Sequence, residues 1–418
     1  MVVSFTKAMK KDYTILIPNM SPVHFTLVKE VFVNHGYKAI LLENQGPNVI
    51  REGLRYVHND ICYPAQLVIG QMIDALKSGL YDVDKTALVI TQTGGGCRAS
   101  NYIFLLRKAL KRCGMEQIPV ISLNFKGMEK NPGMKLTPFM LLQAYSGFVY
   151  GDLLMTLANQ VRPYEDTKGE ADLLVDKWIT YLSEKFANNS GYIGWAMKRN
   201  LNAIAKEFAQ IKTTKVKKIK VGIVGEIYMK YSPLGNNNLQ QFLEDQGCEV
   251  MVPTMMGFLY YGADNAIIDR KYYGGRFISS HFNQFLLKLL FMVEGMSLDA
   301  ISKQGCFSIP STYLEMKRLN EGILDYGVKM GEGWLLTAEM LELVHTGYKN
   351  IVCTQPFGCL PNHICAKGMI RTVTEKAPDA NIVPIDYDPS ATHVNQENRI
   401  KLMLAIAKEK LETATPLG

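Results

Sequence analysis

The chain alternates short apolar runs with helix-length amphipathic segments, and this alternation constrains its fold more than any other feature of the sequence. In the N-terminal part, strands are expected over residues 13–19, 38–43, 86–92 and 119–124, and helices over 21–36, 64–78 and 100–112. Parallel strands need a long crossover between them, which is usually a helix. The pattern therefore predicts an α/β fold built on parallel sheets.

A second series of the same kind begins near residue 218. Strands are expected over residues 218–228, 248–253, 350–356 and 381–387, and helices over 236–247, after Pro361 and over 395–413. Two stretches, residues 165–213 and about 256–346, are instead mostly helical. We predict an N-terminal Rossmann-like lobe over residues 1–164, a helical connector over 165–213 and a C-terminal Rossmann-like lobe over 214–418.

Composition excludes several classes of protein. With 418 residues, 47% of them hydrophobic and 20% charged, the chain is long enough for two to three packed domains and is not of a disordered or disulfide-framework type. Its net charge of +7 is spread along the chain, unlike the clustered basic surface of a nucleic-acid-binding domain. No export signal is visible, and the longest apolar stretch, residues 136–158, is interrupted by polar residues. We expect a cytoplasmic protein that binds neither nucleic acid nor membrane.

The eight cysteines are expected to be thiols or metal ligands rather than disulfides. Three of them share one context, because Cys62 in NDICYPAQ, Cys97 in TGGGCRAS and Cys359 in PFGCLPNH each precede an expected helix. In parallel α/β domains these helix starts meet at the carboxyl edge of the sheet, where sites form. Free N–H groups and the helix dipole there favour negative charge, so we expect lowered thiol pKa values and a thiolate-ligated, anionic cluster.

The spacing of the cysteines bears on which metal they hold. Structural zinc sites use closely spaced cysteine pairs, and this chain has none. Single cysteines from separate loops are compatible with a buried iron–sulfur cluster, whose sulfurs accept backbone hydrogen bonds of the kind that Gly94, Gly95 and Gly96 offer. Three protein ligands leave one iron open, either to bind a substrate oxygen or to move single electrons.

The other cysteines are weaker candidates. Cys353 ends an expected strand directly before the Cys359 loop, so it is a candidate fourth ligand or a neighbouring thiol. Cys306 and Cys365 are less clear. We interpret Cys113 and Cys248 as small buried hydrophobic residues.

Four polar residues are further candidates. Glu332, between two glycines, and Glu226, after the first strand of the second lobe, are candidate acid–base groups, although each is more simply explained as a loop or helix-start carboxylate. Arg98 can pair with an anionic cluster or a thioester oxygen, or it can be a surface residue. His363, four residues after Cys359, is a candidate hydrogen-bond donor near the cluster and not a ligand. No Walker pattern is evident, so a partner would meet any requirement for ATP.

The cysteine segments HNDICYPAQLVIGQMIDAL, TQTGGGCRASNYIFLLRKAL and CTQPFGCLPNHICAKGMI resemble the 2-hydroxyacyl-CoA dehydratase superfamily. This superfamily includes 2-hydroxyglutaryl-CoA dehydratase and benzoyl-CoA reductase subunits and the double-cubane cluster proteins. The chain is most similar to the branch often fused behind a CoA-substrate-specific enzyme activase. The resemblance implies two Rossmann-like lobes with a [4Fe-4S] cluster on Cys62, Cys97 and Cys359 in the cleft between them.

The resemblance also implies a reaction and a partner. An ATP-dependent activator with its own iron–sulfur cluster supplies one electron, which converts a CoA thioester into a ketyl radical, lets the adjacent hydroxyl leave and is then returned. We therefore expect a dehydratase-like lyase or low-potential reductase acting on a CoA thioester or another small molecule. Two alternatives remain at this stage: a double-cubane [8Fe-9S] reductase that also uses Cys353, Cys306 or Cys365, and a non-catalytic electron-relay subunit. A homo- or heterodimer is expected, with residues 165–213 as a candidate contact surface.

Overall fold

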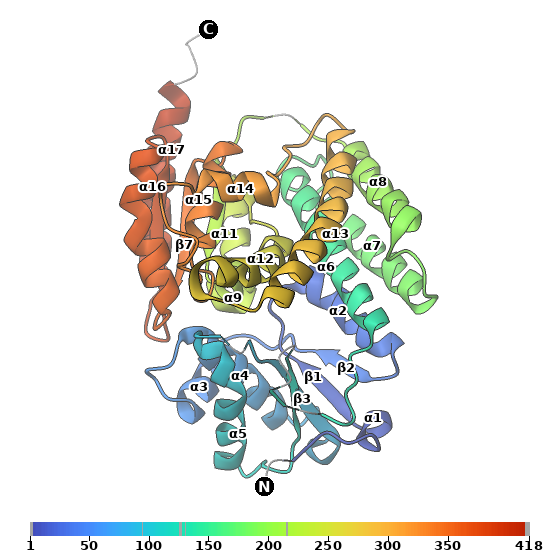
Figure 1. Ribbon diagram of the computed structural model, residues 1–418. Helices are drawn as coiled ribbons and strands as arrows, with labels where there is room; N and C mark the ends of the chain where they lie inside the picture. The colour runs from blue at the N-terminus through green and yellow to red at the C-terminus, as the bar shows by residue number, and fades with distance from the viewer. Residues whose placement is uncertain (1–2, 94, 125–127, 130, 215, 414–418) are drawn as a thin grey trace.

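The computed structural model describes residues 3–93, 95–124, 128–129, 131–214 and 216–413. Each of its two lobes is built on a four-stranded parallel sheet (Figure 1). The first sheet has the order β2–β1–β3–β4, with β1 (Thr14–Ile17), β2 (Lys38–Leu41), β3 (Thr86–Thr91) and β4 (Val120–Leu123). The second has the order β6–β5–β7–β8, with β5 (Lys220–Gly225), β6 (Glu249–Met251), β7 (Asn350–Pro356) and β8 (Asn381–Tyr387). The predicted α/β class with two Rossmann-like parallel-sheet lobes is confirmed.

The two sheets share one strand order, and this order locates the places where sites form. In each sheet the chain starts in an inner strand, moves to one edge and then returns to the other side of the starting strand. In the first sheet, the connection after β1 therefore runs in the opposite direction to the connection after β3. In the second sheet, the same holds for the connections after β5 and β7. Each of these strand pairs thus has a topological switch point at its carboxyl end. Cys97 follows β3 and Cys359 follows β7, so the two cysteines occupy equivalent places in the two lobes.

Helices cover both faces of the first sheet. Ile15 and Ile17 lie in one hydrophobic core with α2 (Pro22–Asn34). Leu16, on the opposite face of the same strand, lies in a second core with α4 (Tyr63–Lys77) and α5 (Tyr102–Arg112). The alternation of side chains along a strand and the apolar character of both faces explain this division. The lobe also contains α1 (Met9–Asp12) and α3 (Pro47–Tyr56).

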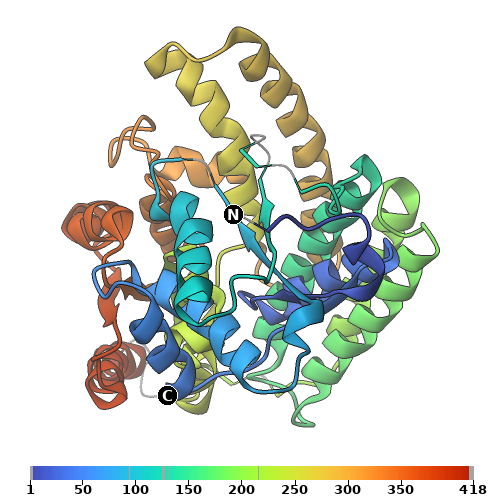
Figure 2. The ribbon, with the colours of Figure 1, turned by 90° about the horizontal axis from the view of Figure 1, so that it is seen from below.

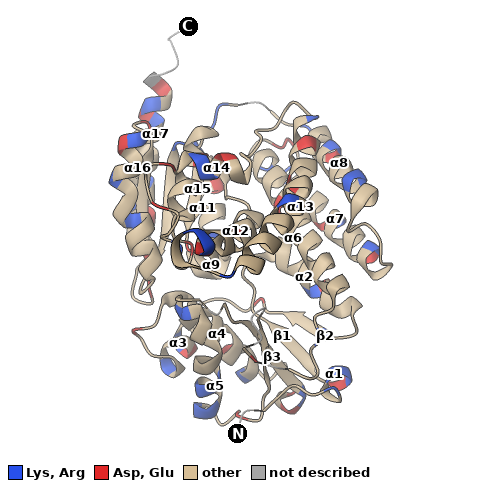
Figure 3. Cartoon of the chain, viewed as in Figure 1, with Lys and Arg blue, Asp and Glu red and all other residues tan. Residues whose placement is uncertain are grey.

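Most of the apolar stretch over residues 136–158 lies in α6 (Pro138–Val161), which packs against helices of both lobes. Its neighbours include α2 and two helices of the central segment, α7 (Glu170–Ala187) and α8 (Gly194–Gln210). Nowhere in the described part of the chain is there a helix long and apolar enough to cross a membrane. The outer helix α8 carries mainly lysine and arginine among its charged residues (Figure 3).

The second lobe carries a long helical insertion between β6 and β7. The helices before it are α9 (Ile227–Tyr231), α10 (Pro233–Asn236) and α11 (Leu239–Asp245). The insertion contains α12 (Met255–Tyr273), α13 (Phe277–Ser302), α14 (Tyr313–Leu319) and α15 (Leu335–His345), and α16 (Ile370–Lys376) and α17 (His393–Thr413) follow it. The yellow-to-gold hairpin of α12 and α13 projects from the body of the molecule (Figure 2).

A buried carboxylate on α6 joins the two lobes. Asp152 accepts hydrogen bonds from the backbone N–H groups of Met255 (2.7 Å) and Met256 (2.9 Å), at the first turn of α12. It also contacts His24 Nε2 at 2.9 Å, and His24 Nδ1 lies 2.8 Å from the hydroxyl of Ser21. The Ser21–His24–Asp152 order is that of a hydrolytic triad, but these three side chains are buried and the carboxylate is occupied by the start of α12. The arrangement is therefore a structural joint.

We expect Asp152→Ala to lower the free energy of unfolding by about 3 kcal/mol, because it leaves two buried N–H groups and His24 without their acceptor. Chemical denaturation measures this change. The matched control is Asp172→Ala, which removes a partly exposed carboxylate paired with Arg162 at 2.8 Å and should cost less than about 1 kcal/mol. Equal losses in the two variants would contradict the role assigned to Asp152.

Candidate functional site

Each of the three predicted cysteines lies at the start of a helical segment, as expected. Cys62 is the N-cap of α4. Cys97 is the N-cap of a short 3-10 turn, η2 (Arg98–Asn101), that leads into α5. Cys359 directly precedes a helical turn that begins at Leu360.

The loop that carries Cys359 lies against the loop that carries Cys62, although the two belong to different lobes. The backbone N–H of Tyr63 donates to the carbonyl of Phe357 at 3.0 Å. Gly358 has a φ of +73°, and a Cβ atom on it would lie 3.2 Å from the Cα of Cys62. This left-handed conformation and this close approach both favour glycine directly before Cys359.

The Cys97 loop is held at the same place by contacts to both lobes. The guanidinium of Arg98 donates to the carbonyl of Asp60 at 2.7 Å, which ties the Cys97 loop to the residues before Cys62. Gly96 faces Met330 of the second lobe so closely that an added Cβ would lie 2.7 Å from the Met330 Cε. We call the place where Cys62, Cys97 and Cys359 meet the cysteine junction.

A hydrogen bond reaches each of the three sulfurs. The Sγ of Cys62 lies 2.8 Å from the hydroxyl of buried Tyr102. The backbone N–H of Ala99 donates to Cys97 Sγ at 3.5 Å, and the side-chain amide of Asn362 donates to Cys359 Sγ at 3.4 Å. Donors in these positions stabilise negative charge on sulfur.

The pKa values of the three thiols differ from the expectation based on helix dipoles. Burial raises the pKa of all three thiols, and it raises that of Cys97 to about 11. The carboxylates of Glu226 and Glu332 add to this effect at Cys97 and Cys359. The predicted lowering of the thiol pKa values is therefore wrong for the protein alone, since desolvation outweighs the hydrogen bonds that favour the thiolate.

Glu226 and Glu332 lie together at the start of α9. A carboxylate oxygen of Glu332 accepts from the N–H of Ile227 at 3.0 Å, and Glu226 accepts from the N–H of Met229 at 2.9 Å. Burial raises the pKa of both, and the charge of Glu332 contributes to raising that of Glu226 to about 8. Gly333, at φ +46°, has no room for a Cβ beside the carbonyl of Val328, so glycine is required next to Glu332. The pair can hold a proton near neutral pH.

A buried ion pair lies behind these carboxylates. Lys230 Nζ contacts an oxygen of Glu339 at 2.6 Å, and both side chains are about 2% exposed. The positive charge of Lys230 also opposes the rise in the pKa values of Glu226 and Glu332. Our sequence analysis missed Glu339 and Lys230. The signal for Glu339 was present, because it and Glu342 are the two charged residues of the mainly apolar segment LLTAEMLEL.

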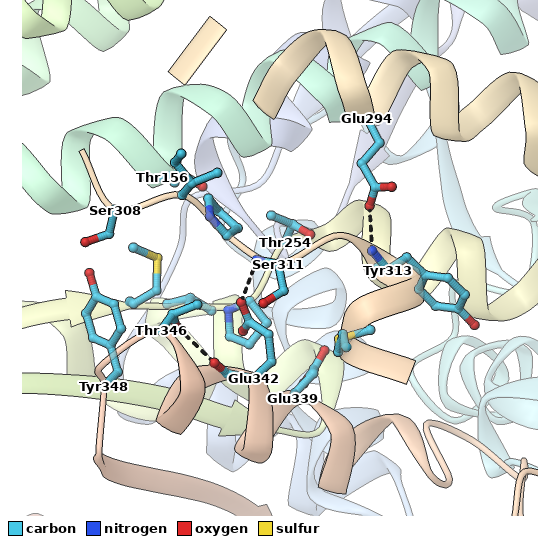
Figure 4. Close-up of a pocket in the computed structure, with 17 residues that line it drawn as sticks. Thr156, Thr254, Glu294, Ser308, Ser311, Tyr313, Glu339, Glu342, Thr346 and Tyr348 are labelled. Carbon is cyan, nitrogen blue, oxygen red and sulfur yellow. Dashed lines mark hydrogen bonds between the residues drawn. The ribbon is translucent and has the colours of Figure 1, made fainter. Parts of the chain in front are cut away.

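Glu339 also lines a small cavity between α15, α13 and the end of β6 (Figure 4). The cavity, of about 40 Å³, has room for a few water molecules. The carboxylates of Glu342 and Glu294 line it as well and accept from the N–H groups of Ser311 (3.1 Å) and Tyr313 (2.9 Å). Burial raises the pKa of both carboxyls to about 7.

Cys353 does not join the cysteine junction. β7 spans residues 350–356 as expected, but Cys353 lies within this strand rather than at its end, opposite Val224. Its side chain is fully buried in an apolar cluster with residues of α15. Cys365 lies in the same cluster, although its thiol is close enough to Glu332 for that carboxylate to raise its pKa. Cys306 is exposed after α13.

The remaining predicted site residues lie at the edge of the junction. Arg98 is exposed, and its positive charge acts on Cys62 to lower the pKa of that thiol. The side chain of His363 is exposed, and its backbone N–H donates to the carbonyl of Cys359, so a hydrogen bond from His363 to a cluster stays a prediction. Gly95 is exposed, and Gly94 lies outside the described residues.

Within the described part of the chain, no three His, Cys, Asp or Glu side chains lie close enough together to hold a single metal ion. The donors at the junction are instead three separate thiols with nearby carboxyls. Searches of protein-family models and of curated proteins find no match to this chain.

The raised pKa values at the cavity predict how stability depends on pH. A carboxyl whose pKa is higher in the folded state than in the unfolded state binds its proton more tightly when the protein is folded. Its contribution to stability is complete below the unfolded pKa, near 4.5, and is lost as the pH rises toward the folded pKa of about 7. For Glu342 the loss is on the order of 3 kcal/mol. We expect the free energy of unfolding to fall over this range, and to fall less in Glu342→Gln, which keeps an acceptor for Ser311.

Denaturant titrations at several pH values measure the slope for both proteins. Glu116→Gln, at an exposed position, controls for the general effect of removing a glutamate. Identical slopes for the wild type and Glu342→Gln would show that the buried carboxyl does not take up a proton on folding.

Proposed function

We propose that this chain is an iron–sulfur protein of the 2-hydroxyacyl-CoA dehydratase type, with a [4Fe-4S] cluster held by Cys62, Cys97 and Cys359. One observation carries the proposal: three thiols from loops of both sheets meet at one junction, each with a hydrogen bond to its sulfur. Thiolates are the usual protein ligands of such clusters, and hydrogen bonds to the sulfurs tune them.

The donor set fits a cluster better than a single ion. Cluster ligands stand further apart than the ligands of one ion, because the iron and sulfide atoms lie between them. The two thiols that follow β3 and β7 come from the switch points of the two sheets, and Cys62 joins them from the start of α4. When bound, a cluster with three protein ligands supplies single electrons at low potential and an iron open to a substrate oxygen.

The chain's own residues would support this chemistry in two ways. The N–H of Ala99 and the amide of Asn362 donate to Cys97 and Cys359, and the hydroxyl of Tyr102 would donate to a Cys62 thiolate, so all three favour the anionic form of the sulfurs. Glu226 and Glu332 hold a proton between them at their carboxyl oxygens, because burial and mutual repulsion oppose ionising both. Such a pair can give a proton to a departing hydroxyl or take one from carbon.

The resemblance of the cysteine segments supports a CoA thioester or another small molecule as substrate and an ATP-dependent activator as the electron donor. The position of Cys353 favours the single-cluster form over a double-cubane form, since its thiol lies in an apolar core inside β7. Three ligands rather than four also favour a catalytic subunit over an electron relay.

Loss of a ligand tests the proposal. We expect Cys97→Ala and Cys359→Ala, each purified without oxygen, to lose most of the iron that the wild type binds. Cys113→Ala removes a thiol at the end of α5 and serves as the matched control, with iron content unchanged. Unchanged iron in both ligand variants would refute the assignment.

A second prediction concerns the hydrogen bond from Tyr102. In Tyr102→Phe the cluster is retained but its midpoint potential falls, because the hydroxyl that stabilises the more negative, reduced state is lost. A spectroscopic redox titration measures the potential. Tyr56→Phe, whose hydroxyl bonds to Lys77 instead, should leave it unchanged, and equal potentials in all three proteins would contradict the role of Tyr102.

A further inference from the structure

The cavity beside Glu339 is lined by more acidic than basic side chains. Its carboxyls come from two helices, Glu294 from α13 and Glu339 and Glu342 from α15 (Figure 4). We call these three groups the cavity carboxyls. Among the described residues, Lys230 is the one cation that forms an ion pair with any of them, and it pairs with Glu339. The cavity therefore lacks positive charge when its carboxyls are ionised.

The two oxygens of Glu339 face different surroundings. Its Oε1 accepts from Lys230 Nζ at 2.6 Å, whereas its Oε2 is buried and has no hydrogen-bond partner in the described part of the chain. Figure 4 shows the carboxyl of Glu339 directed from α15 into the cavity. A buried carboxylate oxygen without a partner is costly, so this atom indicates that the cavity holds a donor or a cation.

Hydroxyl groups add neutral oxygens to the same lining. Thr156, Thr254 and Ser311 line the cavity together with the carboxyls (Figure 4). Thr254 is the N-cap of α12, yet its side chain makes no capping hydrogen bond. Carboxylate and other oxygen ligands suit hard cations.

The size and geometry of the cavity limit which cation it can take. Its volume of about 40 Å³ has room for one small ion with about one or two waters, and not for a bulky organic cation. A divalent ion usually relies on several converging carboxylates, and no such group of three acidic, histidine or cysteine side chains exists within the described residues. A monovalent cation can take most of its ligands from neutral oxygens.

We propose that this cavity binds one small monovalent cation, namely potassium, sodium or ammonium, with the cavity carboxyls as its counter-charges. With Lys230 and one bound ion, two of the three negative charges are balanced. The loop over residues 308–311 and Thr346 line both the cavity and a wider groove at the surface. This shared lining gives the ion a route from solvent.

Protons compete with the cation for the cavity carboxyls. Burial raises the pKa of Glu294 and Glu342 to about 7, and it also raises the pKa of Glu339. As the pH falls below 7, protons therefore neutralise the groups that attract the ion, and its affinity falls.

Other ionisable groups surround the cavity carboxyls. The charged or titratable side chains other than tyrosine are Lys230 on α9, Glu332 before α15, and Glu315 and His345 at the surface groove. The tyrosines nearby are Tyr145, Tyr260, Tyr313 and Tyr348, and burial raises the pKa of each, so they stay neutral. The cavity carboxyls thus account for the expected dependence of ion binding on pH.

The test is the thermal stability of the full chain at pH 8 in tetramethylammonium chloride, whose cation is too large for the cavity. Potassium, sodium or ammonium chloride then replaces this salt at constant ionic strength. Binding to the folded chain should raise the unfolding midpoint in a saturable way with at least one of the three ions. The ion with the lowest apparent dissociation constant is the preferred occupant. At pH 6 this constant should be about 10-fold higher.

Two variants place the ion in the cavity. Glu294→Gln and Glu342→Gln each remove a charge but keep an acceptor for the N–H groups of Tyr313 and Ser311, so the fold should persist, which circular dichroism checks. In each variant the apparent dissociation constant should rise at least about 10-fold. Asp299→Asn is the matched control, because it removes a partly exposed carboxylate that pairs with Lys303 on the same surface of α13, and it should leave the constant unchanged.

Equal unfolding midpoints in all four salts at pH 8 would overturn the proposal. So would an ion effect that both glutamine variants retain, or one that Asp299→Asn abolishes. Each comparison is made between salts on one preparation, so the outcome does not depend on whether the cysteine junction holds a cluster.

Discussion

The placement of the two lobes against each other depends on the buried carboxylate of Asp152. Removing a carboxylate from water is costly, and here two backbone N–H groups at the start of α12 and the ring of His24 offset that cost. Because α6 packs on the first lobe and α12 follows β6 of the second, this one group ties both sheets to the same helix. The loops at the ends of β3 and β7 can then meet.

Two features define the chemistry of the cysteine junction: both sheets have the same strand order, and buried carboxyls outnumber buried cations there. The same topology delivers one cysteine from each sheet to equivalent positions. Behind them, the ammonium of Lys230 acts on the three buried carboxyls of Glu226, Glu332 and Glu339. Buried carboxyls in excess of buried cations retain protons, so these carboxyls can exchange a proton near neutral pH.

Local sequence patterns were sufficient to predict most of the fold and part of the candidate site. Strand and helix positions followed from run length and from glycine and proline, although α3 was missed despite Pro47 in its first turn. The meeting of Cys62, Cys97 and Cys359 was predictable because parallel topology gathers helix starts. What was missed or wrong depends on tertiary structure. Cys353 faces an apolar core within β7, burial raises the thiol pKa values, and Lys230 pairs with Glu339, which lies 109 residues further along the chain.

The most direct test of the central claim is the content of iron and acid-labile sulfide per chain, on protein purified without oxygen, with an EPR spectrum before and after dithionite. The account predicts about four irons per chain and a signal that appears or changes on reduction. About eight irons would contradict the three-ligand assignment and indicate a double-cubane cluster. No iron, even after anaerobic reconstitution, would contradict the account as a whole.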